Sequence, residues 1–208
     1  MRELRKETEI CSISLCKDFK NLEIRNAKYN LQQLKENHLK GKKQKFLFFW
    51  GHQPSKDGSI TKTCFSQWWK SVFIENERKY CCMEQYMMAK KAELFEDDEI
   101  LEEIMETADP KKIKALGRKV KNFDEKKWNE TKYSIVFAGN LLKFSQDENL
   151  KDFLLSTKND IIVEASPYDK IWGIGMSADD EFVENPTRWK GENLLGFALM
   201  EVRDELSK

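Results

Sequence analysis

Glu84 is the first residue whose position suggests chemistry. At about 100° per residue, the run 81–91 reads as a helix with Glu84 inside an apolar face. A buried carboxylate must be paired with a cation, be protonated, or serve in binding or catalysis, because removing an isolated charge from water costs on the order of several kcal/mol. Two interpretations follow: an acid/base group with a raised pKa, or a structural carboxylate that meets a cation such as Lys91 or caps a neighbouring element. The apolar members of the face are Tyr80, Met83, Met87, Met88, Leu94 and Phe95.

Asp169 lies in a second stretch of interest, residues 164–175. A proline turn, Trp172, Gly173 and Gly175 surround it, just after the apolar run 161–163. Glycines let a backbone approach a ligand closely, so this loop is a candidate binding segment. The alternative is an ordinary solvent loop with Asp169 in an Asx turn. Gly-x-Gly alone is weak evidence, and the chain contains no P-loop or Gly-x-Gly-x-x-Gly fingerprint.

Several tryptophans are candidates for a ligand-stacking role. Trp68 and Trp69 are adjacent, and in an extended segment they cannot both face one core, so one is expected to line a cleft. Trp128 follows Asp124, which is expected to cap a helix, and free N–H groups there could bind an anion beside the aromatic ring. The alternative for each is a core position.

The elements that must position these residues are mostly helices. Phe46–Trp50 and Ile161–Val163 read as short buried strands. Aspartates predict the starts of helices near 97–107, 110–117, 124–144 and 147–156. Asn193 is expected to cap a last helix with a broad apolar face. The pattern predicts an α+β fold: one compact, helix-dominated domain with a few short strands.

Residues 1–45 form a basic, partly helical extension, and residues 46–208 form the domain. The extension carries 12 lysines and arginines against 6 acidic residues, although the whole chain has zero formal net charge. Phe19, Leu22, Leu31, Leu34 and Leu39 predict an amphipathic helix ending near Gly41. Such an arm either touches nucleic acid or packs as a solvated helix on the domain.

Composition points to a soluble, cytoplasmic protein without a structural metal. The longest apolar run, 46–50, is too short to span a bilayer. Five cysteines and two histidines show no paired metal-ligand spacing. The sequence leaves the oligomeric state open.

In their order along the chain, these motifs resemble the NADAR (YbiA-like) family of N-glycosidases. The resemblance covers nearly all of the chain except the extension. It rests on Phe65-Ser66-Gln67, Met83-Glu84-Gln85-Tyr86-Met87-Met88-Ala89-Lys90, Leu116-Gly117-Arg118, Trp128, Asp169-x-x-Trp172-Gly173-x-Gly175 and Gly191-x-Asn193-x-Leu195-Gly196-x-x-Leu199-Met200.

The resemblance implies hydrolysis of a bond between a ribose carbon and a nitrogen, with Glu84 and Asp169 as the catalytic carboxylates. It also places Trp128 and Trp172 in the active site. Such a reaction passes through an oxocarbenium-like state and needs no metal or other cofactor. Further expected substrate contacts are Phe49, Ser66, Gln67, Trp68, Lys90, Gly173, Gly175 and Asn193.

Two substrate classes follow from the resemblance. The favoured one is ADP-ribose attached to guanine in nucleic acid, because the basic extension and the abundant aromatic residues suit a nucleic-acid adduct. An ADP-ribosyltransferase toxin would then be a functional partner. The alternative is a small phosphorylated ribosylamine, a reactive phosphoribosylamino-pyrimidine intermediate of riboflavin synthesis. A binding module that recognises ADP-ribose or a nucleotide without cleaving it is the competing class.

Overall fold

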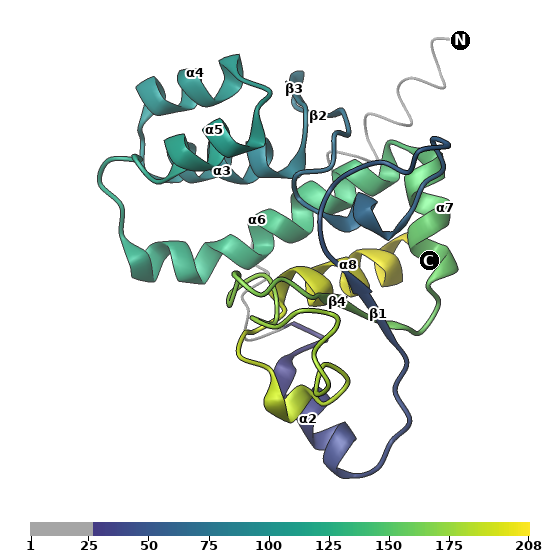
Figure 1. Cartoon of the computed structure of the whole chain (residues 1–208). Coiled ribbons are helices and arrows are strands. Elements are labelled where there is room, and N and C mark those ends of the chain that lie inside the picture. Colours follow the sequence, from purple (N-terminus) through teal and green to yellow (C-terminus); the bar gives the residue numbers. More distant parts are fainter. Residues whose placement is uncertain (1–26) are drawn as a thin grey trace.

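The computed structural model describes residues 27–208 (Figure 1). Phe19 and Leu22 of the predicted N-terminal helix lie outside the described residues. Within them, helices dominate and the strands are short, which confirms the α+β prediction. The elements are α2 (Leu31–Leu39), β1 (Phe46–Phe49), the 3₁₀ helix η2 (Lys62–Phe65), β2 (Phe73–Glu75), β3 (Arg78–Tyr80), α3 (Met83–Leu94), α4 (Asp98–Glu106), α5 (Pro110–Gly117), α6 (Glu125–Ser145), α7 (Glu148–Ser156), β4 (Ile161–Glu164), the 3₁₀ helix η3 (Pro186–Arg188) and α8 (Leu194–Leu206).

Four helices begin where aspartates predict them. The side chains of Asp97, Asp109, Asp124 and Asp147 each accept a hydrogen bond from a backbone N–H in the first turn of α4, α5, α6 and α7. These N–H groups have no partner within the helix, so the carboxylates satisfy them and also favour the positive end of the helix dipole.

The strands β1 and β4 pair in parallel, with Phe49 opposite Glu164. Asn193 joins this sheet to α8, but not as the predicted helix cap. Its backbone is left-handed, with φ of 57°, and its side chain makes no capping bond. Instead its amide accepts from the Glu164 N–H and donates to the Ile162 carbonyl, both at 3.0 Å. The capping prediction was wrong because these tertiary partners use both ends of the side chain.

A small hairpin, β2–β3, was not predicted. Asn76 and Glu77 both have positive φ, as in the type I′ turns that suit two-residue hairpin loops. Tyr80 therefore belongs to a strand and not to the helix face that contains Glu84. Tyr80 is still a core residue, because it is buried and stacks on Phe73. It reaches the core from a strand and not from a helix.

The long helix α6 is the central element of the core (Figure 1). It contacts α8 and α3, while α8 also packs against β4. α4 and α5 in turn pack on α3, on the side of the molecule remote from β1 and β4 in the view of Figure 1. The helix that contains Glu84 is therefore enclosed by neighbouring helices, which explains why eight of its residues are buried.

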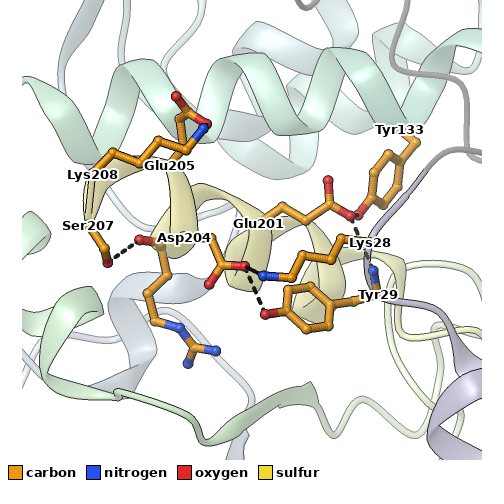
Figure 2. Close-up of polar contacts among 9 residues, drawn as sticks. Lys28, Tyr29, Tyr133, Glu201, Asp204, Glu205, Ser207 and Lys208 are labelled. Atoms are coloured by element: carbon orange, nitrogen blue, oxygen red, sulfur yellow. Dashed lines mark hydrogen bonds and ion pairs between the residues drawn. The ribbon is translucent and has the colours of Figure 1, made fainter.

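Part of the predicted extension is packed on the domain. Leu34 of α2 is buried. Figure 2 shows Lys28 and Tyr29 beside α8, where Lys28 pairs with Asp204 and the Tyr29 hydroxyl donates to Asp204 at 2.8 Å. Leu34 thus belongs to the core of the domain, and Ala27, Tyr29 and Leu31 pack against that core.

No helix among residues 27–208 combines the length and apolar character needed to cross a bilayer.

Candidate active site

Glu84 is enclosed in the first turn of α3, with a relative exposure of 2%. Its backbone N–H donates to the Gln67 carbonyl at 2.9 Å, and its Oε2 accepts from the Trp68 indole N–H at 3.1 Å. Oε1 is buried and accepts no hydrogen bond from residues 27–208. Burial raises the pKa of Glu84 to about 6, while the positive charge of Lys114 and the Trp68 bond oppose that rise.

The expected pairing of Glu84 with Lys91 is wrong. The Lys91 ammonium donates to the Gly117 carbonyl at 2.7 Å and lies over the rings of Phe123 and Trp128. Glu84 is therefore left with an unpartnered oxygen. A native protein seldom leaves a buried acceptor unpaired without a reason such as a ligand or a reaction.

The turn after η2 delivers Trp68 to Glu84. Ser66 Oγ accepts from the Trp68 backbone N–H at 3.2 Å, and Gln67 is buried with its side-chain oxygen unpartnered among the described residues. His52 and Lys114 flank the Trp68 ring at 5.4 and 5.9 Å. Trp68 is thus a contact of the carboxylate, whereas Trp69 packs against the core.

Asp169 forms an Asx turn, as one sequence interpretation expected. Its Oδ1 accepts from the backbone N–H groups of Ile171 and Trp172 at 2.9 and 2.8 Å. This geometry does not remove Asp169 from the site, because its negative charge raises the pKa of both Glu84 and Glu164. The turn fixes the Asp169 carboxylate within electrostatic reach of Glu84 and Glu164.

The two glycines of this loop serve its own backbone. A Cβ on Gly173 would lie 2.8 Å from the Glu164 carbonyl oxygen, and Gly175 has a φ of +64°. The Gly175 N–H donates to the Asp169 carbonyl at 3.0 Å. These glycines let the loop fold tightly around Asp169. From the sequence we expected them to let the backbone approach a ligand, whereas in the structure they let it approach other backbone atoms of the protein.

Glu164 completes a cluster of three carboxylates, and the sequence interpretation missed it as a site residue. It is the last residue of β4, and its Oε2 is enclosed without a hydrogen bond from residues 27–208. Burial raises the pKa of Glu164 to about 8; the charges of Asp169 and Glu84 add to the rise, and Lys114 opposes it. A glutamate at the carboxyl end of an apolar strand was the only sequence signal.

The cations of the site come from α5 and its end. Lys114 and Arg118 both lower the pKa of Glu84. They are four residues apart, so they lie on one face of the helix. The structure does not bring the predicted Lys90 to the carboxylates, since its ammonium pairs with Glu75 at 2.5 Å and Glu93 at 2.9 Å.

The two predicted stacking tryptophans are both half-buried and packed against the core. Trp172 is held by its N–H on Asp169 and by its carbonyl, which accepts from Leu195 at 3.1 Å. Trp128 lies beside Lys91, at 5.7 Å. The start of α6 is less suited to an anion than expected, because the Asp124 carboxylate already accepts the Lys127 N–H.

Phe49 and Asn193 are core residues. Phe49 is 1% exposed and packs edge-on against Phe65, and Asn193 is fully buried between β4 and α8. Both were predicted as substrate contacts; in the structure Phe49 pairs with Glu164 in the sheet, and Asn193 accepts from the Glu164 N–H.

A hollow of about 450 Å³ lies beyond the Asp169 loop in the sequence. The residues that line the hollow are Met176, Asp180, Glu181, Phe182, Arg188 and Lys190.

Within residues 27–208, no group of three or more histidine, cysteine or acidic side chains has the arrangement of a metal site.

Comparison with known proteins identifies the family. Residues 48–207 match the NADAR domain. The chain is 45% identical over 166 residues to N-glycosidase R617 of Acanthamoeba polyphaga mimivirus, covering 77% of this chain and 96% of that protein. It is 33% identical over 112 residues to the riboflavin biosynthesis protein PYRR of Zea mays, covering 52% of this chain and 16% of that protein. The solved structure of Escherichia coli YbiA superposes with a TM-score of 0.63 and 25% identity, covering 79% of this chain and 86% of YbiA. The chain belongs to the NADAR domain family.

Proposed function

We propose that this protein is an N-glycosidase that hydrolyses a ribosyl C–N bond. The observation that carries the proposal is the set of electrostatically coupled carboxylates, Glu84, Glu164 and Asp169, of which Glu84 and Glu164 each have a buried oxygen without a partner among residues 27–208. An oxocarbenium-like transition state is stabilised by nearby negative charge and needs proton transfer on both sides of the broken bond. The relatives named as N-glycosidases support the same reaction class.

Two of the carboxylates have distinct tasks in this proposal. Glu84, with a pKa of about 6, is largely ionised at neutral pH and takes the proton of the attacking water. Asp169, held by its Asx turn, orients the ribose and stabilises the developing positive charge. Trp172 and Trp128 offer aromatic surface to the base or sugar. Lys114 and Arg118 supply positive charge for phosphate, the task first assigned to Lys90.

We further propose ADP-ribose attached to guanine in nucleic acid as the substrate, with an ADP-ribosyltransferase as the counterpart that makes the adduct. Trp50 and Tyr168 favour this class. They are 54% and 85% exposed, and their rings lie 6.1 Å apart. Trp50 follows β1 directly, and Tyr168 is the residue before Asp169. Exposed aromatic rings stack bases with about 1–3 kcal/mol each.

Hydrolysis of a phosphoribosylamino-pyrimidine is the second candidate, favoured by the similarity to PYRR. A non-catalytic module that binds ADP-ribose is the third.

One product assay separates the three candidates. Wild type, Glu84→Gln and Asp169→Asn are incubated with a guanine-ADP-ribosylated oligonucleotide and, separately, with the pyrimidine intermediate. We expect release of ADP-ribose from the oligonucleotide, reduced by about 10²-fold or more in both variants. Glu93→Gln is the matched control, because Glu93 lies on the same helix in ion pairs with Arg78 and Lys90. Turnover of the pyrimidine alone would establish the second candidate, and ligand binding without turnover the third.

The aromatic pair gives a separate test of the nucleic-acid substrate. Trp50→Ala and Tyr168→Ala should raise KM for an oligonucleotide by roughly 5-fold or more, which corresponds to about 1 kcal/mol of lost stacking. The same variants should leave KM for an ADP-ribosylated mononucleotide unchanged, because it has no flanking base. Equal effects on both substrates would place the pair in contact with the adduct itself.

A further inference from the structure

We propose that Glu164 is the catalytic residue that donates a proton to the departing nitrogen. This inference rests on the proposed N-glycosidase function and assigns the acid that the reaction needs. Poor leaving groups such as the amine of a nucleobase do not depart as anions, so a protonated group must lie next to the bond that breaks.

The backbone of Glu164 is fixed on both sides. Its N–H donates to Asn193 Oδ1 at 3.0 Å, and its carbonyl accepts from the Ile174 N–H at 2.9 Å. The parallel pairing with Phe49 fixes the strand, and Gly173 leaves no space above the carbonyl. These bonds fix the backbone from which the Glu164 side chain projects, and a fixed origin favours the defined position that a proton donor requires.

One oxygen of the Glu164 side chain is a hydrogen-bond acceptor without a donor among residues 27–208. Oε2 is enclosed and receives no hydrogen bond from the described part of the chain, as is also true of Glu84 Oε1; the other Glu84 oxygen, Oε2, receives the Trp68 indole N–H. A protonated carboxyl satisfies such a position with its own O–H once a ligand nitrogen is present.

The charged groups that act on Glu164 also favour its protonated form. Asp169 from the loop and Glu84 from α3 repel a further negative charge, and Lys114 from α5 opposes them. Together with burial, they raise the pKa of Glu164 to about 8, above that of Glu84 at about 6. At neutral pH, Glu164 is the carboxyl that carries a proton and Glu84 the one that accepts one.

The step balances in protons and electrons. The Glu164 proton moves to the leaving nitrogen as the C–N bond breaks, and both bonding electrons go with that nitrogen. Water adds its hydroxide to the ribosyl carbon and gives its proton to Glu84. Proton exchange with solvent then returns the cluster to its starting state.

The test compares two leaving groups on the same ADP-ribosyl donor: guanine, which needs protonation, and 4-nitrophenolate, which leaves unaided. We expect Glu164→Gln to lower kcat on the guanine adduct by about 100-fold or more and to change the nitrophenyl reaction by less than about 3-fold. The wild-type rate on guanine should fall as pH rises through about 8. Glu201→Gln, which alters a partly buried glutamate on α8 bonded to Tyr133, is the control and should keep wild-type rates.

Equal loss on both substrates, or no loss on guanine, would overturn this assignment while leaving the N-glycosidase function standing. Wild-type protein inactive on both ADP-ribosyl donors and on the pyrimidine intermediate would overturn the function and the assignment together. A measurement without turnover completes the test: the infrared band of a protonated carboxyl should be present in the wild type at neutral pH and absent from Glu164→Gln. Its persistence in the variant would assign the proton to another carboxyl.

Discussion

At the scale of single residues, Glu84 and Glu164 have different proton affinities. Glu84 has an indole donor and the charges of Lys114 and Arg118, all of which favour its ionised form. For Glu164, only the charge of Lys114 favours the ionised form, while the charges of Asp169 and Glu84 disfavour it. One carboxyl is therefore suited to accept a proton and the other to give one, a division seen wherever environments push two pKa values apart.

Trp68→Phe tests this difference by removing the indole donor while keeping a ring. Because the lost hydrogen bond favoured ionised Glu84, its pKa should rise. If ionised Glu84 accepts the proton from water, the acid limb of the pH–kcat profile should move to higher pH. The measurement is kcat on the preferred substrate between about pH 5 and about pH 8.

Trp69→Phe is the matched control, because Trp69 packs against the core and has no bond to Glu84. An acid limb that stays in place in Trp68→Phe would assign that limb to a group other than Glu84.

Sequence reasoning reached some of these residues and not others, for a physical reason. Glu84 could be predicted because a charge in an apolar helical face is visible locally. Glu164 and Lys114 could not, since each acts through groups on other elements. Asn193 was misread because its tertiary partners are 29 and 31 residues away, at Glu164 and Ile162.

At the scale of elements, local chemistry specified the helices well. Aspartate caps and the proline at the start of α5 set the helix starts, and these signals depend on neighbouring residues only. The β2–β3 hairpin was missed because its strands have three residues each and its turn lacks the usual glycine. Short strands depend on their surroundings, here Gln146 of the α6 C-cap, which bonds both backbone groups of Ile74.

Helix α2 contains a matched pair of leucines that tests whether it belongs to the domain. Leu34 is 5% exposed and Leu39 is 76% exposed. Leu34→Ala should lower the free energy of unfolding by about 2–4 kcal/mol, because it removes buried apolar surface and leaves a cavity. Leu39→Ala should change it by less than about 0.5 kcal/mol.

Urea unfolding of both variants measures this difference. Similar small effects would show that α2 is a detachable extension, as the predicted boundary after residue 45 implied.

At the scale of the whole molecule, the carboxylate cluster links stability to pH. The folded pKa values of Glu84 and Glu164, about 6 and about 8, exceed the ordinary value of 4.5. The folded state therefore binds more protons than the unfolded state between pH 4.5 and 8, and stability must fall as pH rises through that range. Below 4.5 both states are protonated and this loss is absent.

Glu164→Gln should flatten the decline. An amide cannot ionise, so the variant should lose less stability than the wild type between about pH 5 and about pH 8, by on the order of 2–4 kcal/mol. Urea unfolding at several pH values measures both slopes. Parallel slopes would mean that Glu164 is ionised in the folded protein.

The parallel pairing of β1 with β4 has a consequence for biosynthesis. Phe49 and Glu164 are partners in register although most of the chain lies between them. During translation, the apolar strand 46–49 leaves the ribosome long before its partner exists, and closing so long a loop is entropically costly. Until then the strand is an unpaired edge open to aggregation or to a chaperone. The Glu164 backbone is fixed by that same pairing and by its hydrogen bond to Asn193, the residue before α8. The carboxylate cluster therefore assembles only when nearly the whole polypeptide has been made.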